Sequence, residues 1–388
     1  MEDDAVALVR ERSSGQNDFQ LWQLSTPSVP GAGINKLFER SRQEHFFFKC
    51  PCCSRRTELT FPECLVITAD NENDPRIKDS HLICKECKGK LEHAAKHVFL
   101  ASGIWVPKYP DRDIFGPHIN QMYSSARACH PVRLAKAACR ARLNSTDEQE
   151  FYNSKLGLPH IVAGSNVTRG HVELCVKGYR SAQKDMMNGV ITCGIDVGTR
   201  CHYEIVRWQF RESVRSIDIN VEAKPQVIMA GWFRDFHEAD TIMRKFSPAM
   251  TVIDQMPDPR KSMEFARRYP GRVKLCHYSS GLVAREIIDH GEIITVDRTF
   301  WLDLSLGRFI NGTIELPGDI SEEYKSHVCA LVRIYRDKKS EGKPTGEKIA
   351  LYKATGDDHH GHARNYSEMA LKIIHGSGVN MPMTGRVW

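Results

Sequence analysis

Hydrophobic and polar positions follow the clearer pattern in the second half of the chain. From about residue 188, apolar runs of strand length are separated by segments of helical periodicity. Strands are expected over 190–196, 202–210, 214–221, 226–232, 250–254 and 272–277. Helices are expected near 236–246, 260–269, 281–289, 321–335 and 362–375. Consecutive strands, followed by strands that helices separate, predict an α/β layer with a mixed sheet.

The first half is less regular and divides by composition. Residues 1–45 lead from an acidic stretch into a short strand pattern that prolines interrupt, and 46–100 is a small α+β segment dominated by cysteine pairs. Residues 101–187 are expected to be mainly helical, with a helix over 125–143. Glycine and serine near the end of that region mark the best boundary to a final domain, 188–388.

Composition places the chain among soluble globular proteins. Its 388 residues, 41% hydrophobic and 26% charged, suffice for about two or three domains. The chain has no apolar run long enough to span a membrane, and its acidic first residues are unlike a signal peptide, so we expect a cytoplasmic protein. In that compartment 13 cysteines indicate metal binding or burial, not disulfides. A net charge of +6 is too mild to establish a nucleic-acid partner by itself.

Two Cys-x-x-Cys pairs in the segment 46–100 predict a structural zinc site. The pairs are Cys50 with Cys53 and Cys84 with Cys87. Each two-residue gap lets a tight turn direct both thiolates at one ion, and four sulfurs complete a closed tetrahedron. Cys52 competes with Cys53 for its position, because spacing alone cannot separate them. A zinc-ribbon-like segment with Zn²⁺ as structural cofactor is therefore expected.

Aspartates at three separate places close apolar runs. Asp196 ends the run 190–196, Asp254 ends 250–254, and the adjacent Asp357 and Asp358 follow a strand-like approach. One aspartate after a strand is usually a turn former or helix cap. Several that meet at one sheet edge instead form an oxygen-ligand site for Mg²⁺ or Mn²⁺. Two such ions about 4 Å apart can activate water and cut a phosphodiester bond.

Other residues compete for parts of this site. Asp218 and Asp303 also lie in apolar runs, but neither closes its run, so we rank them below the three positions above. His359, His360 and His362 follow the last acid directly. We expect them to orient that acid or pack the following helix rather than to bind zinc.

Cations gather in two places that could contact DNA. The first is the expected helix over 125–143, which carries Arg127, Arg133, Lys136, Arg140 and Arg142 without an intervening acid. The second brackets a polar hairpin that leads to the last acids; its cations are Arg333, Arg336, Lys338, Lys339, Lys343, Lys348 and Lys353. Phosphate contacts from such groups would make binding weaken with salt. A solvated helix face explains the first cluster equally well, whereas the second is contiguous with the proposed site.

The order of short motifs resembles lambda-type large terminase subunits of tailed phages over nearly the whole chain. No single motif is specific, but their order is. The segments are Ser25–Pro27, the cysteine pairs from Cys50 to Cys87, Gly103–Trp105, Phe115–Tyr123, Phe151–Gly157, Gly194–Asp196, Val252–Asp254 and Asp358–Tyr366. This family joins an ATPase motor to a nuclease of RNase H-like fold, and both act in cutting and packaging viral DNA.

The resemblance implies specific roles. Asp196, Asp254 and Asp358 would hold two Mg²⁺ or Mn²⁺ ions, with Asp357 as the alternative third ligand. Double-stranded viral DNA, a small terminase subunit, a portal protein and a separately encoded ATPase half would be partners in the host cytoplasm. The sequence contains no Gly-x-x-x-x-Gly-Lys-[Ser/Thr] phosphate loop. We therefore expect residues 1–45 to be the end of an ATPase domain, and no ATP hydrolysis by this chain alone.

Two other interpretations stay open. The chain could be a non-catalytic, zinc-containing module that binds DNA or a partner protein. It could also be another RNase H-like nuclease or a transposase, since that fold and its metal site serve several substrates.

Overall fold

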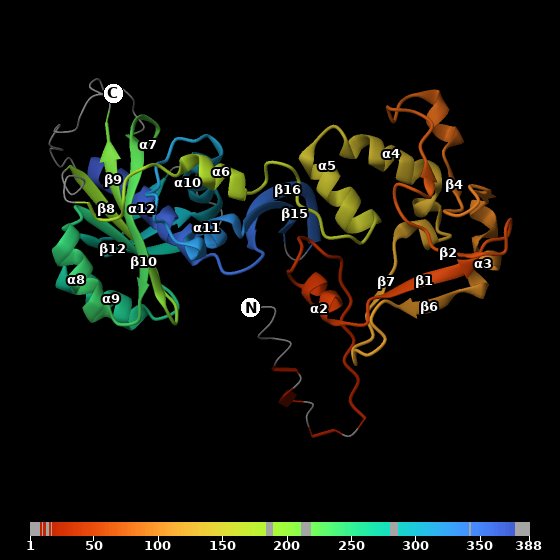
Figure 1. The fold of residues 1–388 in the computed structure, drawn as a ribbon, viewed down its shortest axis with the longest axis horizontal. Coiled ribbons are helices and arrows are strands. Elements are labelled where there is room, and N and C mark those ends of the chain that lie inside the picture. The colour runs from red at the N-terminus through yellow and green to blue at the C-terminus, as the bar shows by residue number, and fades with distance from the viewer. Residues whose placement is uncertain are drawn as a thin grey trace. The chain divides into compact units, whose positions relative to one another are not determined.

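The computed structural model describes residues 8–9, 11–12, 15–16, 18–183, 189–210, 219–279, 286–340 and 343–376. The chain forms two compact units, which are treated separately below. Unit 1 comprises residues 1–165 and 334–349, and unit 2 comprises 166–333 and 350–388 (Figure 1). Across the described residues, no helix is both long and apolar enough to cross a membrane.

A seven-stranded mixed sheet forms the centre of unit 2, with strand order β10-β9-β8-β11-β12-β14-β13. Its strands are β8 (Val190–Asp196), β9 (Cys201–Gln209), β10 (Lys224–Phe233), β11 (Met250–Asp254), β12 (Val273–Ser279), β13 (Ile287–Asp289) and β14 (Ile293–Asp297). The first three strands are antiparallel neighbours, whereas β8, β11, β12 and β14 are parallel. The edge strand β13 pairs antiparallel with β14, so the sheet is parallel at its centre and antiparallel towards both edges, which confirms the mixed-sheet prediction.

Helices cover both faces of this sheet because the side chains of its strands alternate between two cores. Ile191 and Ile195 of β8 pack with α8 (Phe236–Phe246) and α9 (Pro259–Arg268). Val190 and Val252 instead share a core with the helices of the other face. Those helices are α6 (Arg169–Cys175), α10 (Arg298–Ile310), α11 (Glu322–Cys329) and α12 (His359–Gly376). A short helix, α7 (Ile219–Glu222), precedes β10. Unit 2 is thus a three-layer α/β/α arrangement.

Helix α12 lies directly on the central strand β8. A Cβ atom built on Gly194 would come within 1.9 Å of the Ala363 carbonyl oxygen and 2.5 Å of the Ser367 amide nitrogen. Both obstructing atoms belong to the helix backbone, so only glycine permits this approach. The contact places the first turn of α12 beside the end of β8.

Unit 1 contains two small sheets. One has the order β2-β1-β6, with β7 also paired to β1, and the other has the order β3-β4-β5. The strands are β1 (Glu44–Lys49), β2 (Arg56–Thr57), β3 (Leu65–Val66), β4 (His81–Ile83), β5 (Lys90–Leu91), β6 (Ile104–Pro107) and β7 (Pro117–His118). The α-helices are α2 (Ile34–Arg40), α3 (Lys96–Phe99), α4 (Pro131–Ala141) and α5 (Ser145–Glu150). Phe48, Leu82 and Leu134 belong to their common core.

The final hairpin consists of β15 (Leu331–Ser340) and β16 (Lys343–Ala354), which pair only with each other among the described strands. Its outer residues, 334–349, belong with unit 1. The predicted domain boundaries at residues 45, 100 and 187 stay predictions. The two compact units meet at residue 165 instead, and unit 1 also includes residues 334–349 of the hairpin.

Most predicted elements of unit 2 are confirmed, and three need correction. The predicted strand 214–221 is wrong where it is described, because residues from 219 are helical; 211–218 lie outside the described residues. The predicted helix 281–289 ends in β13, and 280–285 are likewise not described. The predicted helix 321–335 stops at Cys329, where the β-branched, apolar start of β15 becomes a buried strand.

Candidate active site and metal centres

Two of the predicted acids end neighbouring parallel strands. Asp196 is the last residue of β8 and Asp254 the last of β11. The preceding residues, Ile195 and Ile253, are register partners, so both acids leave the sheet at the same edge and level. Buried apolar strands hold their backbones, which is the rigid placement that a metal or catalytic site needs.

The third acid position lies at the start of α12. Asp358 directly precedes the helix and is partly buried, whereas Asp357 is exposed. The Asp358 carboxylate lies 3.3 Å from Nε2 of His362, one helical turn later. The geometry therefore favours Asp358 over Asp357 as a member of the site.

His359 connects the helix to the strand. Its Nδ1 lies 2.9 Å from the Asp196 carboxylate, and Asp196 raises the pKa of this histidine. Two of the three histidines thus orient acids, as predicted, although His359 contacts Asp196 instead of the aspartate beside it. The third, His360, is buried and contacts other histidines.

The acids differ in electrostatic environment. Burial raises the pKa of Asp254 to about 6, and the nearby Asp196 carboxylate adds to the rise, although the Met256 amide donates to Asp254 at 3.1 Å and opposes it. Burial also acts against ionisation of Asp358, but hydrogen bonding to His362 and the charge of Arg298 leave its pKa lowered. Asp196 and Asp254 are therefore close enough to repel each other, and a cation between them would relieve that repulsion.

The three carboxylates do not converge on a single point. Within the described parts of the chain, potential ligand atoms of three or more residues lie within 4.8 Å of one another in two other clusters only, one of cysteines and one of histidines. A one-ion cage from Asp196, Asp254 and Asp358 is thus not preformed.

The rival acids have other positions. The Asp303 carboxylate accepts hydrogen bonds from Nε of Arg333 at 2.9 Å and from the Tyr352 hydroxyl at 2.8 Å. These contacts give Asp303 a structural role between α10 and the final hairpin. Asp218 lies outside the described residues.

Sequence reasoning missed one cation at the site. Arg298 begins α10, and its Nη2 lies 3.1 Å from Nε2 of His362, the ring that also contacts Asp358. The sequence did hold a signal for Arg298, because this residue follows Asp297, the last residue of β14. Strand β14 ends at the same edge of the sheet as β11 and β12. Arg298 places positive charge beside His362 and Asp358.

The four predicted zinc ligands come together in unit 1. The sulfur atoms of Cys50, Cys53, Cys84 and Cys87 all lie within 4.8 Å of one another. Backbone amides donate to three of the sulfurs at 3.3–3.4 Å, an arrangement that stabilises thiolates. Four convergent sulfurs fit the closed tetrahedral geometry of structural zinc.

The competing cysteines point elsewhere. Cys52 Sγ lies 3.8 Å from the Lys90 carbonyl oxygen, and the buried Cys64 donates to the Glu58 carbonyl at 3.4 Å. The structure thus separates Cys53 from Cys52, which the spacing could not do.

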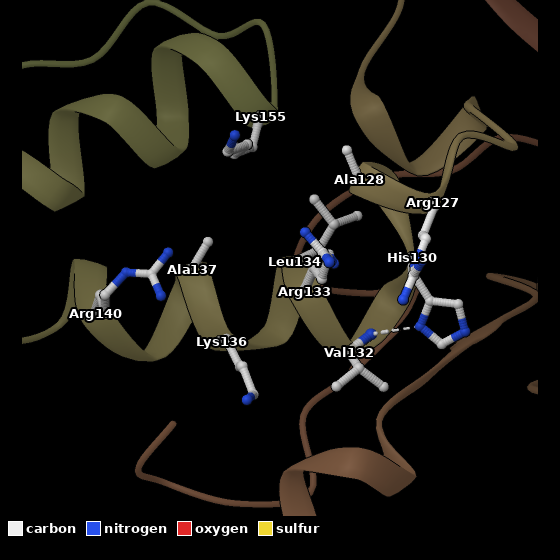
Figure 2. Close-up of a pocket in the computed structure, with 10 residues that line it drawn as sticks. All are labelled: Arg127, Ala128, His130, Val132, Arg133, Leu134, Lys136, Ala137, Arg140 and Lys155. Carbon is white, nitrogen blue, oxygen red and sulfur yellow. Dashed lines mark hydrogen bonds between the residues drawn. The ribbon is translucent and has the colours of Figure 1, made fainter. Parts of the chain in front are cut away.

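The predicted basic helix lines an open cavity of about 730 Å³. Figure 2 shows side chains of α4 and of the preceding turn around it, with Lys155 on a separate helical segment. Its cations are Arg127, Arg133, Lys136, Arg140 and Lys155. Of these, Arg140 is paired with Glu72 at 2.6 Å, whereas no described carboxylate lies within 4 Å of the other four. The concave, largely unneutralised surface suits phosphate groups.

The second cationic cluster is weaker than its sequence suggests. Arg333 is paired with Asp303, and Lys338 with Glu347 at 2.9 Å. Arg336 is exposed, while the side chains of Lys339 and Lys343 lie outside the described part. DNA binding by both clusters stays a prediction.

Comparisons with known proteins point to phage terminases. A family model described as "Phage terminase large subunit gpA, ATPase domain" matches residues 1–105, and no curated protein matches. The nuclease of the large terminase from thermophilic phage G20c has a TM-score of 0.32 at 8% identity, covering 53% of this chain and 98% of its own.

Two further large terminases are also similar. The HK97 bacteriophage protein has a TM-score of 0.34 at 12% identity, over 61% of this chain and 49% of its own. The large terminase of another thermophilic bacteriophage has a TM-score of 0.32 at 13% identity, over 58% of this chain and 49% of its own. The chain thus spans about half the length of these two proteins. Through residues 1–105, this chain is similar to the large subunits of phage terminases.

Proposed function

We propose that this chain is a metal-dependent DNA endonuclease, the cutting part of a phage packaging terminase large subunit. One observation carries the proposal. Asp196 and Asp254 end adjacent parallel strands at one level, and Asp358 directly precedes the helix that packs on those strands. Acids fixed in this way supply oxygen ligands for hard divalent cations.

The strand order supports an RNase H-like nuclease domain. Three antiparallel strands continue into parallel strands through β8, with helices on both faces. The acids project from the carboxyl ends of the central parallel pair, where α/β sheets commonly bind ligands.

In this proposal Asp196, Asp254 and Asp358 hold two Mg²⁺ or Mn²⁺ ions. Bound ions would supply a water of lowered pKa and stabilise the charge that develops on the phosphate. His359 holds the Asp196 carboxylate in place, and Arg298 provides positive charge beside Asp358. Such supporting contacts fix ligand orientation before substrate arrives.

The rest of the chain would connect cutting to packaging. We assign structural Zn²⁺ to the four-cysteine cluster and DNA contact to the basic surface on α4. The family match over 1–105 supports a relation to the ATPase part of a terminase, although the phosphate loop is missing from this sequence. Viral DNA, a small subunit, a portal protein and a separate ATPase half are the proposed partners.

Plasmid cleavage tests the nuclease. The purified chain with Mg²⁺ or Mn²⁺ should nick or cut supercoiled plasmid, and chelation should stop it. Asp254→Asn should slow cleavage about a thousandfold, or ~4 kcal/mol, because one ion loses an anionic ligand. Asp357→Asn is the matched control, since this exposed neighbour of Asp358 should be dispensable.

The opposite pattern would favour a different function. Full cleavage by Asp254→Asn would disprove the proposed site. Tight, salt-sensitive DNA binding without cleavage under either metal would instead support the non-catalytic DNA-binding module. Equal loss in Asp357→Asn and Asp358→Asn would mean that the two acids share the third position.

A further inference from the structure

Three histidines form a buried cluster in unit 2, next to the acid edge but made of different residues. His202 lies on β9, His327 on α11 and His360 on α12. Their side chains are 3%, 6% and 1% exposed, and one ring nitrogen from each lies within 4.8 Å of the other two. Nitrogens from three distant parts of the chain thus converge in the interior.

Four ring nitrogens of these histidines have no hydrogen-bond partner among the described residues. Both ring nitrogens of His202, and Nδ1 of His327 and of His360, are buried without one. Each unsatisfied buried polar group destabilises the folded protein, because it has given up its hydrogen bonds to water. Several such atoms together are rare in a native core unless a bound ion or an ordered water molecule interacts with them.

The ring geometry suits a shared ion better than a stack. Ring centroids of the three pairs are 4.9–5.3 Å apart, and the planes are inclined by 39–83°, so the rings converge at different angles. Neutral imidazole nitrogens arranged in this way are ligands for Zn²⁺ and similar transition metals, whereas Mg²⁺ prefers oxygen.

A carboxylate stands beside His202 at the edge of the cluster, outside the group of ligand atoms that all lie within 4.8 Å of one another. A Glu323 carboxylate oxygen lies 3.6 Å from Nε2 of His202, too far for a hydrogen bond. Two ligands of one tetrahedral zinc ion, each bonded at about 2.1 Å, stand roughly 3.4 Å apart. Glu323 is also partly exposed and lies 3.8 Å from Arg200, so it offers a route between solvent and the cluster.

We propose that His202, His327 and His360 bind a divalent transition metal of the Zn²⁺ type, with Glu323 beside His202 at the edge of the site. This site is separate from the four cysteines, which belong to unit 1, and from the carboxylates of the proposed nuclease. Because its ligands come from β9, α11 and α12, a bound ion joins three elements that lie far apart in sequence.

The metal acts on the acid edge through one neighbour. His359 stacks on His202 with ring centroids 4.7 Å apart and planes 8° from parallel, and its Nδ1 contacts the Asp196 carboxylate. An ion held by His202 and His360 therefore fixes the first turn of α12. Its role is to position Asp196 and the start of the helix, not to contact substrate.

Metal content of the full chain tests this site. After loading with Zn²⁺ and removal of free ion, wild type should retain about two zinc ions per chain, one at each tetrahedral site. His327→Gln should lose one ion and the Cys84→Ser/Cys87→Ser variant the other. His118→Gln is the matched control, because this half-buried histidine of unit 1 already contacts the Leu156 carbonyl oxygen.

Two further measurements keep the result decisive. Asp254→Asn should retain both zinc ions, which separates this site from the proposed nuclease even if that proposal fails. X-ray absorption of zinc-loaded wild type requires no variant and should show imidazole ligands as well as sulfur. A purely sulfur environment, or zinc content unchanged in a folded His327→Gln protein, would overturn the inference.

Discussion

Arg364 provides a sharp test of how α12 is held on the sheet. It is fully buried, and its Nη1 donates to a Glu204 oxygen on β9 at 2.7 Å, while Nη2 contacts Glu368 one turn later. Glu368 is also paired with Arg308. Glu204 has, besides Arg364, the Tyr324 hydroxyl, which donates to it at 2.7 Å.

Replacing Arg364 with methionine leaves the two acids unequally compensated. Glu368 retains Arg308, but Glu204 retains only a neutral hydroxyl. Removal of one partner from a buried ion pair costs about 3–5 kcal/mol, so we expect Arg364→Met to lose about 4 kcal/mol of unfolding free energy in unit 2. Because a whole domain is stable by only about 5–15 kcal/mol, the loss should be obvious.

The loss should depend on pH with a definite sign. Burial already raises the pKa of Glu204. Without Arg364 that pKa rises further, so the folded variant binds a proton more tightly than the unfolded chain does. Stability of Arg364→Met should therefore be best preserved in acid and fall as pH rises through the folded-state pKa of Glu204.

Hydrogen exchange of β8 amides, followed by mass spectrometry, measures the opening of unit 2 without assuming that both units unfold together. Glu204→Gln in the Arg364→Met background should recover about 2 kcal/mol, since the uncompensated charge is gone. Arg267→Met breaks an exposed pair with Glu292 in the same unit and should cost under about 1 kcal/mol. A smaller loss for Arg364→Met than for this control, or no recovery in the double variant, would refute the reasoning.

Three further predictions follow from single contacts. Gly194→Ala should destabilise unit 2 by at least about 3 kcal/mol in thermal unfolding, because the added Cβ meets the α12 backbone. Gly356→Ala, with open space around it, should not be destabilised. Equal effects of the two substitutions would contradict the close contact between β8 and α12. Arg133→Ala with Lys136→Ala should weaken DNA binding and reduce the log–log salt slope by roughly 2; an unchanged slope would exclude the α4 surface. Burial lowers the pKa of Lys96 from its ordinary value of 10.5 to about 8. The free energy of unfolding of unit 1 should therefore increase by about 2–3 kcal/mol as pH rises from 8 to 10.5, because the unfolded chain binds more protons over that range. In urea titrations Lys96→Met should lack this increase.

Much of the candidate site could be predicted locally. Asp196 and Asp254 are recognisable because each ends an apolar run, and a strand keeps its last residue at a sheet edge wherever the sheet lies. The cysteine pairs are recognisable because two intervening residues fix the turn between thiolates. By contrast, the predicted helix 281–289 ends in β13, since a short apolar run fits either structure until neighbouring strands are known.

Other features depend on approach between distant segments. In the sequence Asp303 resembles a metal ligand, but in the structure its carboxylate accepts hydrogen bonds from Arg333 and Tyr352. His202 and His327 lie in unrelated segments, and only the packing of β9 against α11 and α12 brings their nitrogens to His360.

The sequence by itself determined strands β8 to β12 of the central sheet, the acids that end β8 and β11, and the four-cysteine spacing, because these follow from local periodicity and turn length. Only the tertiary structure separated Cys53 from Cys52, showed Asp358 partly buried beside His362, and gathered the buried histidines. Those outcomes depend on which side chains the folded core removes from water, and burial is a property of the whole packed chain rather than of any one segment.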